Sequence, residues 1–399
     1  MPASFPADRL REIEPEALSP ARKGRGARTN PTGRFERTRI EPDLAALETA
    51  GPLLASETRD ASRDPPRTRT LPDRSRRVLS RNDSPDLPFE ASLNPYRGCE
   101  HGCVYCYARP THELLGYSAG LDFETKILVK DEAPRLLRRE LSSPRWIPRT
   151  VMLSGVTDAY QPIERRLEIT RRCIRVFADF RNPIRLVTKN ALVARDVDLL
   201  RELAEFRAVS VALSITTLDS DLQRALEPRA SSSAERLRAL ERLSSAGIPT
   251  GVMVAPVIPG LTDSETPRIL EAARSAGARW ASQTVLRLPH GLPSLFDDWL
   301  ATHRPLRRKK VLHRLEALRG GRLDDPRFGS RMRGEGRFAE QIADLFRLSA
   351  RRHGLEGSPP GLSTDAFRRP GGAQLAFAFG TSNAAAREPA ERDPGSCPE

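Results

Sequence analysis

The chain has 399 residues, 38% of them hydrophobic and 29% charged, which is enough for one large core or two ordinary ones plus tails. No apolar run approaches the roughly 18 residues that span a bilayer. Residues 1–16 are polar where a signal peptide would be apolar. We therefore expect a cytoplasmic protein without a membrane segment. The five cysteines do not form the even set of a disulfide framework, so in a reducing compartment they favour a metal site.

The net charge of +13 comes from 65 basic and 52 acidic residues. The basic excess is concentrated in residues 304–352, which include the run Arg307, Arg308, Lys309 and Lys310. Such a segment attracts polyanions, so nucleic acid is one predicted partner. The alternative is an ordinary solvated helical face.

Residues 1–85 are rich in Pro, Arg, Asp, Ser and Thr and show little hydrophobic periodicity. This composition predicts an N-terminal arm that is mostly disordered or runs extended around the domain. At the other end, residues 381–399 are polar and rich in Ala and Pro, and they predict a disordered tail that contains Cys397.

Between residues 86 and 300, short apolar runs alternate with longer amphipathic stretches. Six strand-then-helix units predict a parallel sheet with right-handed crossovers. The expected fold class is α/β, a partial (β/α)6 TIM-like barrel whose catalytic groups lie at the carboxyl ends of the strands. A basic helical extension is expected over residues 301–380. The predicted strands are 89–93, 150–154, 184–188, 208–214, 250–256 and 280–286, and the clearest helices are 163–180, 233–246 and 263–276.

The strongest local signal is the loop Arg97-Gly-Cys-Glu-His-Gly-Cys-Val-Tyr-Cys-Tyr107, in which the cysteines are spaced C-x3-C-x2-C. Such a loop can direct Cys99, Cys103 and Cys106 at three corners of a four-iron, four-sulfur (4Fe-4S) cluster. The fourth iron then stays open for the amino and carboxylate groups of S-adenosylmethionine (SAM). Tyr105 is placed to lie against the cluster or the adenine.

Other readings of the three cysteines compete with this one. A zinc site would need His101 or His112 as the fourth ligand, and it would usually pair two C-x2-C units. An ordinary electron-transfer cluster would need a fourth cysteine. Cys173 is the only candidate, and its helical neighbours predict a core position. The cysteines could also be unrelated.

The loop resembles the signature of radical SAM enzymes, in the branch related to spore photoproduct lyase. The resemblance covers about residues 88–300, and GRGAR at 24–28 and RFE at 34–36 also resemble the family. The segments that carry it are NPYRGC at 94–99, CYAR at 106–109, TDAYQPIE at 157–164, TKN at 188–190, SITT at 214–217 and APVIPG at 255–260.

The resemblance implies roles for residues that follow the predicted strands. The set after the second strand would lie near the methionine amino group: Ser154, Gly155, Thr157 and Asp158. The set after the fourth would reach the ribose or carboxylate: Ser214 or Thr216, and Glu227. The stretch Pro256 to Gly260, with Pro259 inside it, would pass the adenine. Lys189 would face a carboxylate or an anionic substrate. Ordinary turns, caps and a solvated lysine are the alternatives for these residues.

The implied activity is reductive cleavage of SAM to a 5′-deoxyadenosyl radical, with electrons from a donor such as flavodoxin or ferredoxin. The substrate is not indicated. One departure argues against photolesion repair, because residues 146–154 hold no cysteine where that enzyme has its hydrogen-atom donor. Tyr160 and Tyr107 are the alternative relays. Two further hypotheses are a non-catalytic iron–sulfur protein that binds nucleic acid or senses redox state, and a zinc-stabilised binding module.

Overall fold

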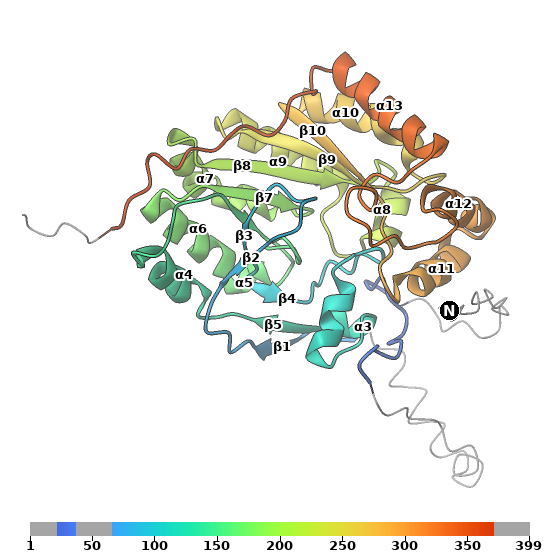
Figure 1. Cartoon of the computed structure of the whole chain (residues 1–399), viewed down its shortest axis with the longest axis horizontal. Coiled ribbons are helices and arrows are strands. Elements are labelled where there is room, and N and C mark those ends of the chain that lie inside the picture. The colour runs from blue at the N-terminus through green and yellow to red at the C-terminus, as the bar shows by residue number, and fades with distance from the viewer. Residues whose placement is uncertain (1–21, 37–65, 371–399) are drawn as a thin grey trace, which may run out of the picture.

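The architecture is an α/β fold built on a seven-stranded sheet (Figure 1). The computed structural model describes residues 22–36 and 66–370. Strand order is β10-β9-β8-β7-β6-β3-β2, in which six neighbours run parallel and only β2 is antiparallel. The strands are β2 Leu79–Arg81, β3 Ala91–Leu93, β6 Val151–Leu153, β7 Ile184–Thr188, β8 Val209–Ile215, β9 Thr250–Val257 and β10 Trp280–Val285.

The six parallel strands confirm the six predicted ones, and their order along the sheet follows their order in the chain. No pairing joins β10 to β2 or β3 among the described residues, so the barrel is open along one side. All seven residues of β8 are buried, as expected for a central parallel strand covered on both faces.

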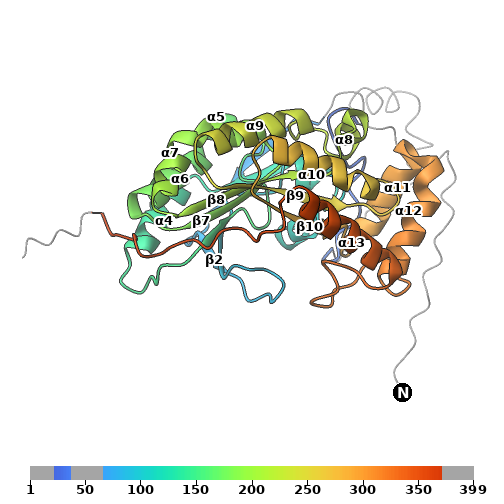
Figure 2. The same cartoon turned by 90° about the horizontal axis from the view of Figure 1, so that it is seen from above.

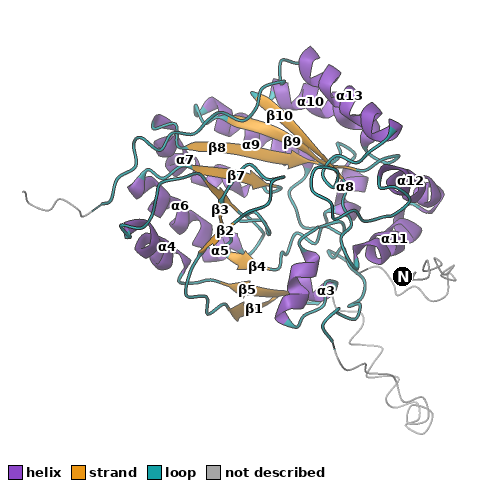
Figure 3. Ribbon diagram, in the orientation of Figure 1, coloured by secondary structure: helices purple, strands orange, loops and turns teal. Residues whose placement is uncertain are grey.

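Helices cover one face of the sheet and supply the crossovers between its strands (Figures 2 and 3). A capping box between Ser232 and Glu235 starts α9, and Gly247 with φ +81° follows its end, as predicted. The predicted helix 163–180 is instead two helices, because Glu168 adopts a left-handed φ of 51° between them. The helices are α4 Ala133–Ser142, α5 Glu164–Leu167, α6 Ile169–Phe180, α7 Val197–Glu205, α8 Ser220–Leu226, α9 Ser233–Ser245 and α10 Thr266–Ser275.

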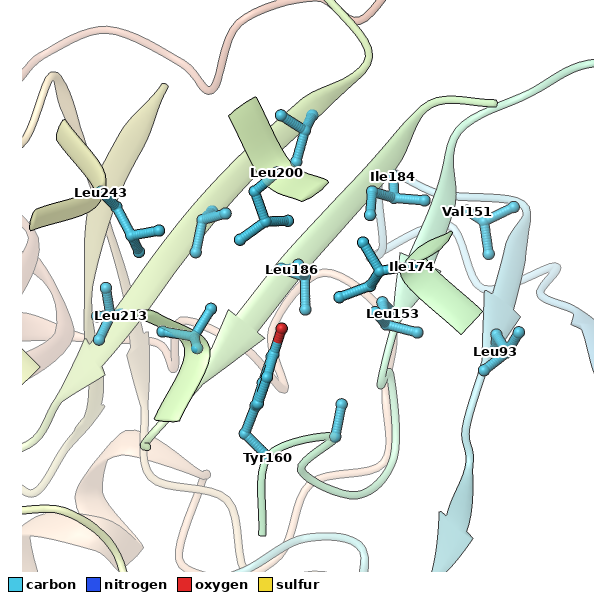
Figure 4. Close-up of a cluster of buried hydrophobic side chains, with 14 of the residues drawn as sticks. Leu93, Val151, Leu153, Tyr160, Ile174, Ile184, Leu186, Leu200, Leu213 and Leu243 are labelled. Atoms are coloured by element: carbon cyan, nitrogen blue, oxygen red, sulfur yellow. The ribbon is translucent and has the colours of Figure 1, made fainter. Parts of the chain in front are cut away.

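The core lies between the sheet and these helices (Figure 4). Leu93, Leu153, Leu186 and Leu213 come from four strands and are at most 1% exposed. Cys173 is fully buried in the same cluster, which confirms its predicted core position.

A second, three-stranded sheet joins β1 Arg69–Pro72, β5 Lys126–Val129 and β4 Tyr96–Arg97. β1 pairs parallel to β5, and β4 pairs antiparallel to it. Residues 69–81 therefore supply β1 and β2 to the two sheets, so this part of the predicted arm forms strands at the edges of the sheets. Residues 1–21 and 37–65 lie outside the described residues.

The predicted helical extension contains α12 Pro305–Leu318 and α13 Arg337–Arg352. It is preceded by α11 Leu292–His303, which runs across the expected boundary at 300 and packs its Phe296 and Trp299 into a cluster with Cys103. Residues 371–399, with the predicted tail, lie outside the described residues. Within the part that the structure describes, no helix is long and apolar enough to cross a membrane.

Candidate cluster and cofactor site

The cysteine loop follows β4 and is fixed by backbone hydrogen bonds at both ends. Cys99 N donates to Phe123 O at 2.9 Å, and Val104 N donates to Leu226 O at 3.1 Å. Gly98 has φ +79°, and a Cβ atom there would lie only 2.9 Å from Phe123 O. A side chain at this position would thus force the loop away from its support.

The three thiols of the loop lie near one another and are free of disulfides. Burial raises the pKa of all three thiols. For Cys99, the charges of Asp158, Cys106 and Cys103 raise the pKa further. Grouped buried thiols without a proton acceptor are poor nucleophiles, but a bound metal deprotonates them outright. The donor set therefore fits a metal cluster.

A buried ion pair supports the loop from behind. Arg109 and Glu124 are both fully buried and bond to each other. Arg109 Nε donates to Cys103 O at 3.0 Å, and its Nη2 donates to Gly102 O at 3.2 Å. Glu124, in α3 Leu121–Thr125, also accepts from the backbone of Gly26 at 3.0 Å. Neither member of this pair was predicted as a site residue.

The arm segment 24–28 packs directly on the same loop. A Cβ atom on Gly26 would lie 1.8 Å from Gly102 O, so the two backbones touch. Ala27 N donates to Glu124 Oε1 at 2.8 Å. This part of the arm is therefore a structural component of the site.

Asp158 links the loop to the end of β7. Its carboxylate accepts from Thr188 Oγ1 at 2.7 Å and from Lys189 N at 2.8 Å, and it lies 3.4 Å from His101 Nδ1. Burial alone raises the pKa of Asp158, but His101 and these hydrogen bonds hold it at about 2. The side chain is thus a permanent anion beneath the loop.

Glu227 is the centre of a second buried network. Its carboxylate accepts from Tyr105, from Arg236 and, at 2.6 Å, from Thr216. Although burial raises the pKa of such a group, Arg236 and Lys189 hold that of Glu227 at about 2.

Lys189 belongs to the same network. Its Nζ donates to Ser214 Oγ at 2.6 Å and to Ala255 O at 2.9 Å, and it lies 3.9 Å from Glu227. Four predicted residues, namely Tyr105, Ser214, Thr216 and Glu227, are thus brought together with Lys189, while Arg236 was missed. The Glu227 oxygens already accept hydrogen bonds from three side chains. The role that this network supports for Glu227 is therefore to hold Lys189 in position.

The segment after β6 contacts the cysteine loop through Tyr107. Tyr107 OH donates to Gly155 O at 2.6 Å, and Thr157 Oγ1 donates to Tyr96 O at 3.1 Å. Ser154 has a positive φ of 67°, and its buried hydroxyl finds no hydrogen-bond partner in the part of the chain that the structure describes. A strained residue with an orphaned hydroxyl fits the predicted contact to a polar ligand.

The segment predicted to pass the adenine, Pro256 to Gly260, lies partly at an outer pocket and partly in the hydrophobic core. Pro259 and Gly260 line an outer pocket of about 590 Å³ with Arg307 and Lys310. Ile258, between Pro256 and Pro259, is fully buried in the cluster that contains Cys103 and Tyr105. Ile258 lies inside the predicted stretch without having been singled out in it, and it packs with the cysteine loop.

The structure gives less support to a zinc site at the cysteines and to Tyr160 as a relay. His101 Nε2 lies 3.1 Å from Asn190, and His112 is packed against Phe123, so neither imidazole is placed as a zinc ligand beside the thiols. No three His, Cys, Asp or Glu side chains of the described ranges gather tightly enough to chelate one ion. A cubane spreads its thiolates over three irons, so a wider spacing suits it. Tyr160 is fully buried and bonds to Asp196 at 3.1 Å, which removes it as a relay.

The matched segment of the chain is residues 93–273, which fit the sequence model of the Radical SAM superfamily. Members of that superfamily use a 4Fe-4S cluster and SAM. An uncharacterized protein of Mycobacterium tuberculosis is 39% identical over 221 residues, covering 55% of this chain and 65% of that protein. An uncharacterized protein of Methanocaldococcus jannaschii is 32% identical over 173 residues, covering 43% of this chain and 62% of that one.

Solved structures share the fold. A spore photoproduct lyase double mutant with bound AdoMet and dinucleoside spore photoproduct superposes with a TM-score of 0.51 at 16% identity, over 71% of this chain and 79% of that one. A single mutant of the same enzyme gives 0.51 at 17% identity over the same shares. Residues 93–273 of this chain thus match the Radical SAM superfamily, and the chain shares the fold of spore photoproduct lyase.

Proposed function

We propose that the chain is a radical SAM enzyme that holds a 4Fe-4S cluster through Cys99, Cys103 and Cys106 and acts on a substrate still to be identified. The observation that carries the proposal is the grouping of three free thiols, two buried and that of Cys106 partly buried, on one loop at the carboxyl ends of parallel strands. When bound, the cluster supplies the electron that cleaves SAM to methionine and a 5′-deoxyadenosyl radical, which takes a hydrogen atom from the substrate.

The chain's own residues orient the cofactors and exclude water. Lys189 lies close enough to Cys103 and Cys106 for its charge to lower the pKa of both thiols. This position supports Lys189 as the residue that meets the carboxylate of SAM, as the resemblance implies. Ser154 offers an unpartnered oxygen to the amino group, as the resemblance implies. Tyr105 and Ile258 cover the loop on its inner side. Tyr107 remains a predicted hydrogen-atom relay.

Electrons from a donor such as flavodoxin or ferredoxin would enter from the outer side of the loop. A groove of about 360 Å³ there is lined by Glu100, which follows Cys99, and by Arg165, Arg166 and Arg229. Arg229 pairs with Glu100 at 3.1 Å, whereas Arg165 and Arg166 are exposed. An acidic carrier fits this groove and is thereby brought next to Cys99.

The basic segment 304–352 stays a predicted contact for nucleic acid. Part of its charge is neutralised inside the protein, since Arg308 pairs with Asp297 at 2.6 Å and Arg314 with Asp263 at 2.9 Å. Arg307, Lys309 and Lys310 lie on the same helix, and Arg307 and Lys310 line the 590 Å³ pocket.

The test is anaerobic reconstitution of the full chain with iron and sulfide, followed by SAM and dithionite. We expect about four irons per chain and formation of 5′-deoxyadenosine. Cys103→Ala should lose both, whereas Cys173→Ala should keep both, because Cys173 lies in the core. Iron without any nucleoside across several reductants would select the non-catalytic alternative, and zinc without iron would select the binding module.

A further inference from the structure

Arg287 is a partly buried cation whose Nε–H donor is buried and has no acceptor among the described residues. It follows β10, between the buried Leu286 and Leu288. Within residues 22–36 and 66–370, its buried Nε atom has no acceptor, and its one side-chain hydrogen bond runs from Nη1 to Met332 Sδ at 3.5 Å, a weak acceptor. Leaving a buried donor unpaired costs about 1–3 kcal/mol, more for a charged group, so this position calls for an explanation.

The charges that face Arg287 do not neutralise it. Arg331, Asp324, Tyr107 and Asp86 lie near enough to act on it electrostatically. Arg331 is already bonded to Asp86 at 2.5 Å and to Ser84 at 2.7 Å. No ion pair within 4 Å joins Arg287 to either aspartate among the described residues. Burial, followed by the charge of Arg331, lowers the pKa of Arg287, and an incoming anion would oppose both effects.

The backbone around Arg287 is held in place by another arginine. Arg319 is buried and donates from Nη2 to Leu286 O at 2.8 Å and from Nη1 to Arg331 O at 2.8 Å. Val285 N also donates to Met332 O at 3.2 Å. The guanidinium of Arg287 therefore projects from a fixed frame, which suits a binding residue.

The position of Arg287 separates it from the cofactor residues. Lys189 acts electrostatically on the thiols of both Cys103 and Cys106, together with the buried Arg236 at Cys103 and the buried Arg109 at Cys106. Arg287 acts instead on Tyr107, which follows Cys106 and reaches across to Gly155 at the end of β6. Lys189 is therefore near the thiols of Cys103 and Cys106, whereas Arg287 is near Tyr107.

We propose that Arg287 binds an oxyanion of the substrate, a carboxylate or a phosphate, and so orients the substrate at the Tyr107 side of the site. The guanidinium presents parallel N–H donors that match two oxygens of either group. This inference rests on the proposed function for its biological setting, while the anion site itself is a property of the folded chain.

The experiment compares Arg287→Gln, Arg287→Lys and the control Arg333→Gln in the full chain. Arg333 is exposed on the same loop as Met332, so its loss changes the net charge equally. Inorganic phosphate and acetate are titrated separately, and the rise in thermal unfolding midpoint gives each dissociation constant. SAM binding to the reconstituted protein is measured in parallel.

We expect Arg287→Gln to weaken the preferred anion at least about tenfold, Arg287→Lys to restore part of it, and Arg333→Gln to match the wild type. The stronger of the two titrations identifies the substrate group as phosphate or carboxylate. SAM affinity should stay within about twofold, because Lys189 is the cation assigned to SAM.

Equal anion binding by Arg287→Gln and Arg333→Gln would overturn the proposal, as would a wild type that binds neither anion. A tenfold loss of SAM affinity in Arg287→Gln would also overturn it, by assigning Arg287 to the cofactor carboxylate. Failure to load a cluster would refute the proposed function alone, because the anion titrations do not require iron.

Discussion

Glu227 carries a structural charge on which the inner part of the site depends. It is fully buried and bonds to Arg236, which is also fully buried, and it lies beside Lys189. Replacing the carboxylate would leave a buried guanidinium without a counter-charge. We predict that Glu227→Gln lowers the free energy of unfolding in urea by about 3–5 kcal/mol. The control Asp221→Asn breaks an exposed pair with Arg224 and should cost well under about 1 kcal/mol; equal effects would contradict the assignment.

His112 makes part of the stability depend on pH. Its ring is fully buried beside Tyr117 and Phe123, and burial lowers the pKa of His112 from 6.5 to about 4. Between these values the unfolded chain binds the proton and the folded chain does not. Stability from this group is therefore complete above about pH 6.5 and falls as the pH drops toward 4.

We predict that His112→Phe removes this loss. From pH 8 to pH 5 the wild type should lose about 2 kcal/mol more free energy of unfolding than His112→Phe does. Urea titrations of both proteins at the two pH values measure the difference. Parallel pH profiles would mean that His112 is protonated in the folded protein too.

The cysteines could be located from the sequence because the ligands of one cluster share a short loop with a recognisable spacing. Arg109, Glu124 and Arg236 could not, because each acts through partners that only the fold brings close. Arg236, for example, lies in the first turns of a helix, where an arginine usually faces solvent, yet it is fully buried against Glu227. The spacing of the cysteines in the sequence identifies the cluster ligands. The residues that hold the ligands in position can be identified only from tertiary contacts.

At the scale of elements, the arm segment 24–28 acts as a brace for the cysteine loop. The Gly26 backbone touches Gly102 and donates to Glu124. We predict that Gly26→Ala displaces the brace and lowers the iron retained after reconstitution several-fold, since its Cβ atom would overlap Gly102 O. Gly33→Ala is the control, because its Cβ atom would meet nothing closer than 3.4 Å. Iron assays after desalting compare the two, and equal retention would show that the brace is dispensable.

The parallel strands were predictable where a short apolar run, buried throughout in β8 and at alternate residues in β7, is followed by an amphipathic helix. β1 and β2 were not, because they are three or four residues long, largely exposed, and become strands only through pairing with β5 and β3. The break at Glu168 was also missed, since the apolar periodicity continues across it while a left-handed backbone interrupts the helix. Hydrophobic periodicity in a sequence indicates which residues are buried. It does not indicate that an exposed segment pairs at the edge of a sheet.

At the scale of the whole molecule, contacts between loops partly close the open sheet. Asp86, in the loop between β2 and β3, bonds to Arg331 and to Gly329 N, in the loop after α12. One loop belongs to the β2 edge, and the other bonds to the end of β10 at Val285. The groove beside Glu100 shares no lining residue with these two loops. Under the proposed function, we predict that the electron donor docks at this groove and that the substrate enters by a separate route.

Separate routes make the route of electrons testable without disturbing the chemistry. The double variant Arg165→Gln/Arg166→Gln removes two exposed cations from the groove beside Glu100. We predict that it slows cluster reduction by a photoreduced flavodoxin about tenfold at low salt, while dithionite, which needs no docking face, still supports wild-type formation of 5′-deoxyadenosine. Arg351→Gln/Arg352→Gln on α13 removes the same charge elsewhere and should reduce at nearly the wild-type rate. If both double variants slow equally, net charge rather than the groove guides the donor; if dithionite turnover falls as well, the groove arginines act on the site itself.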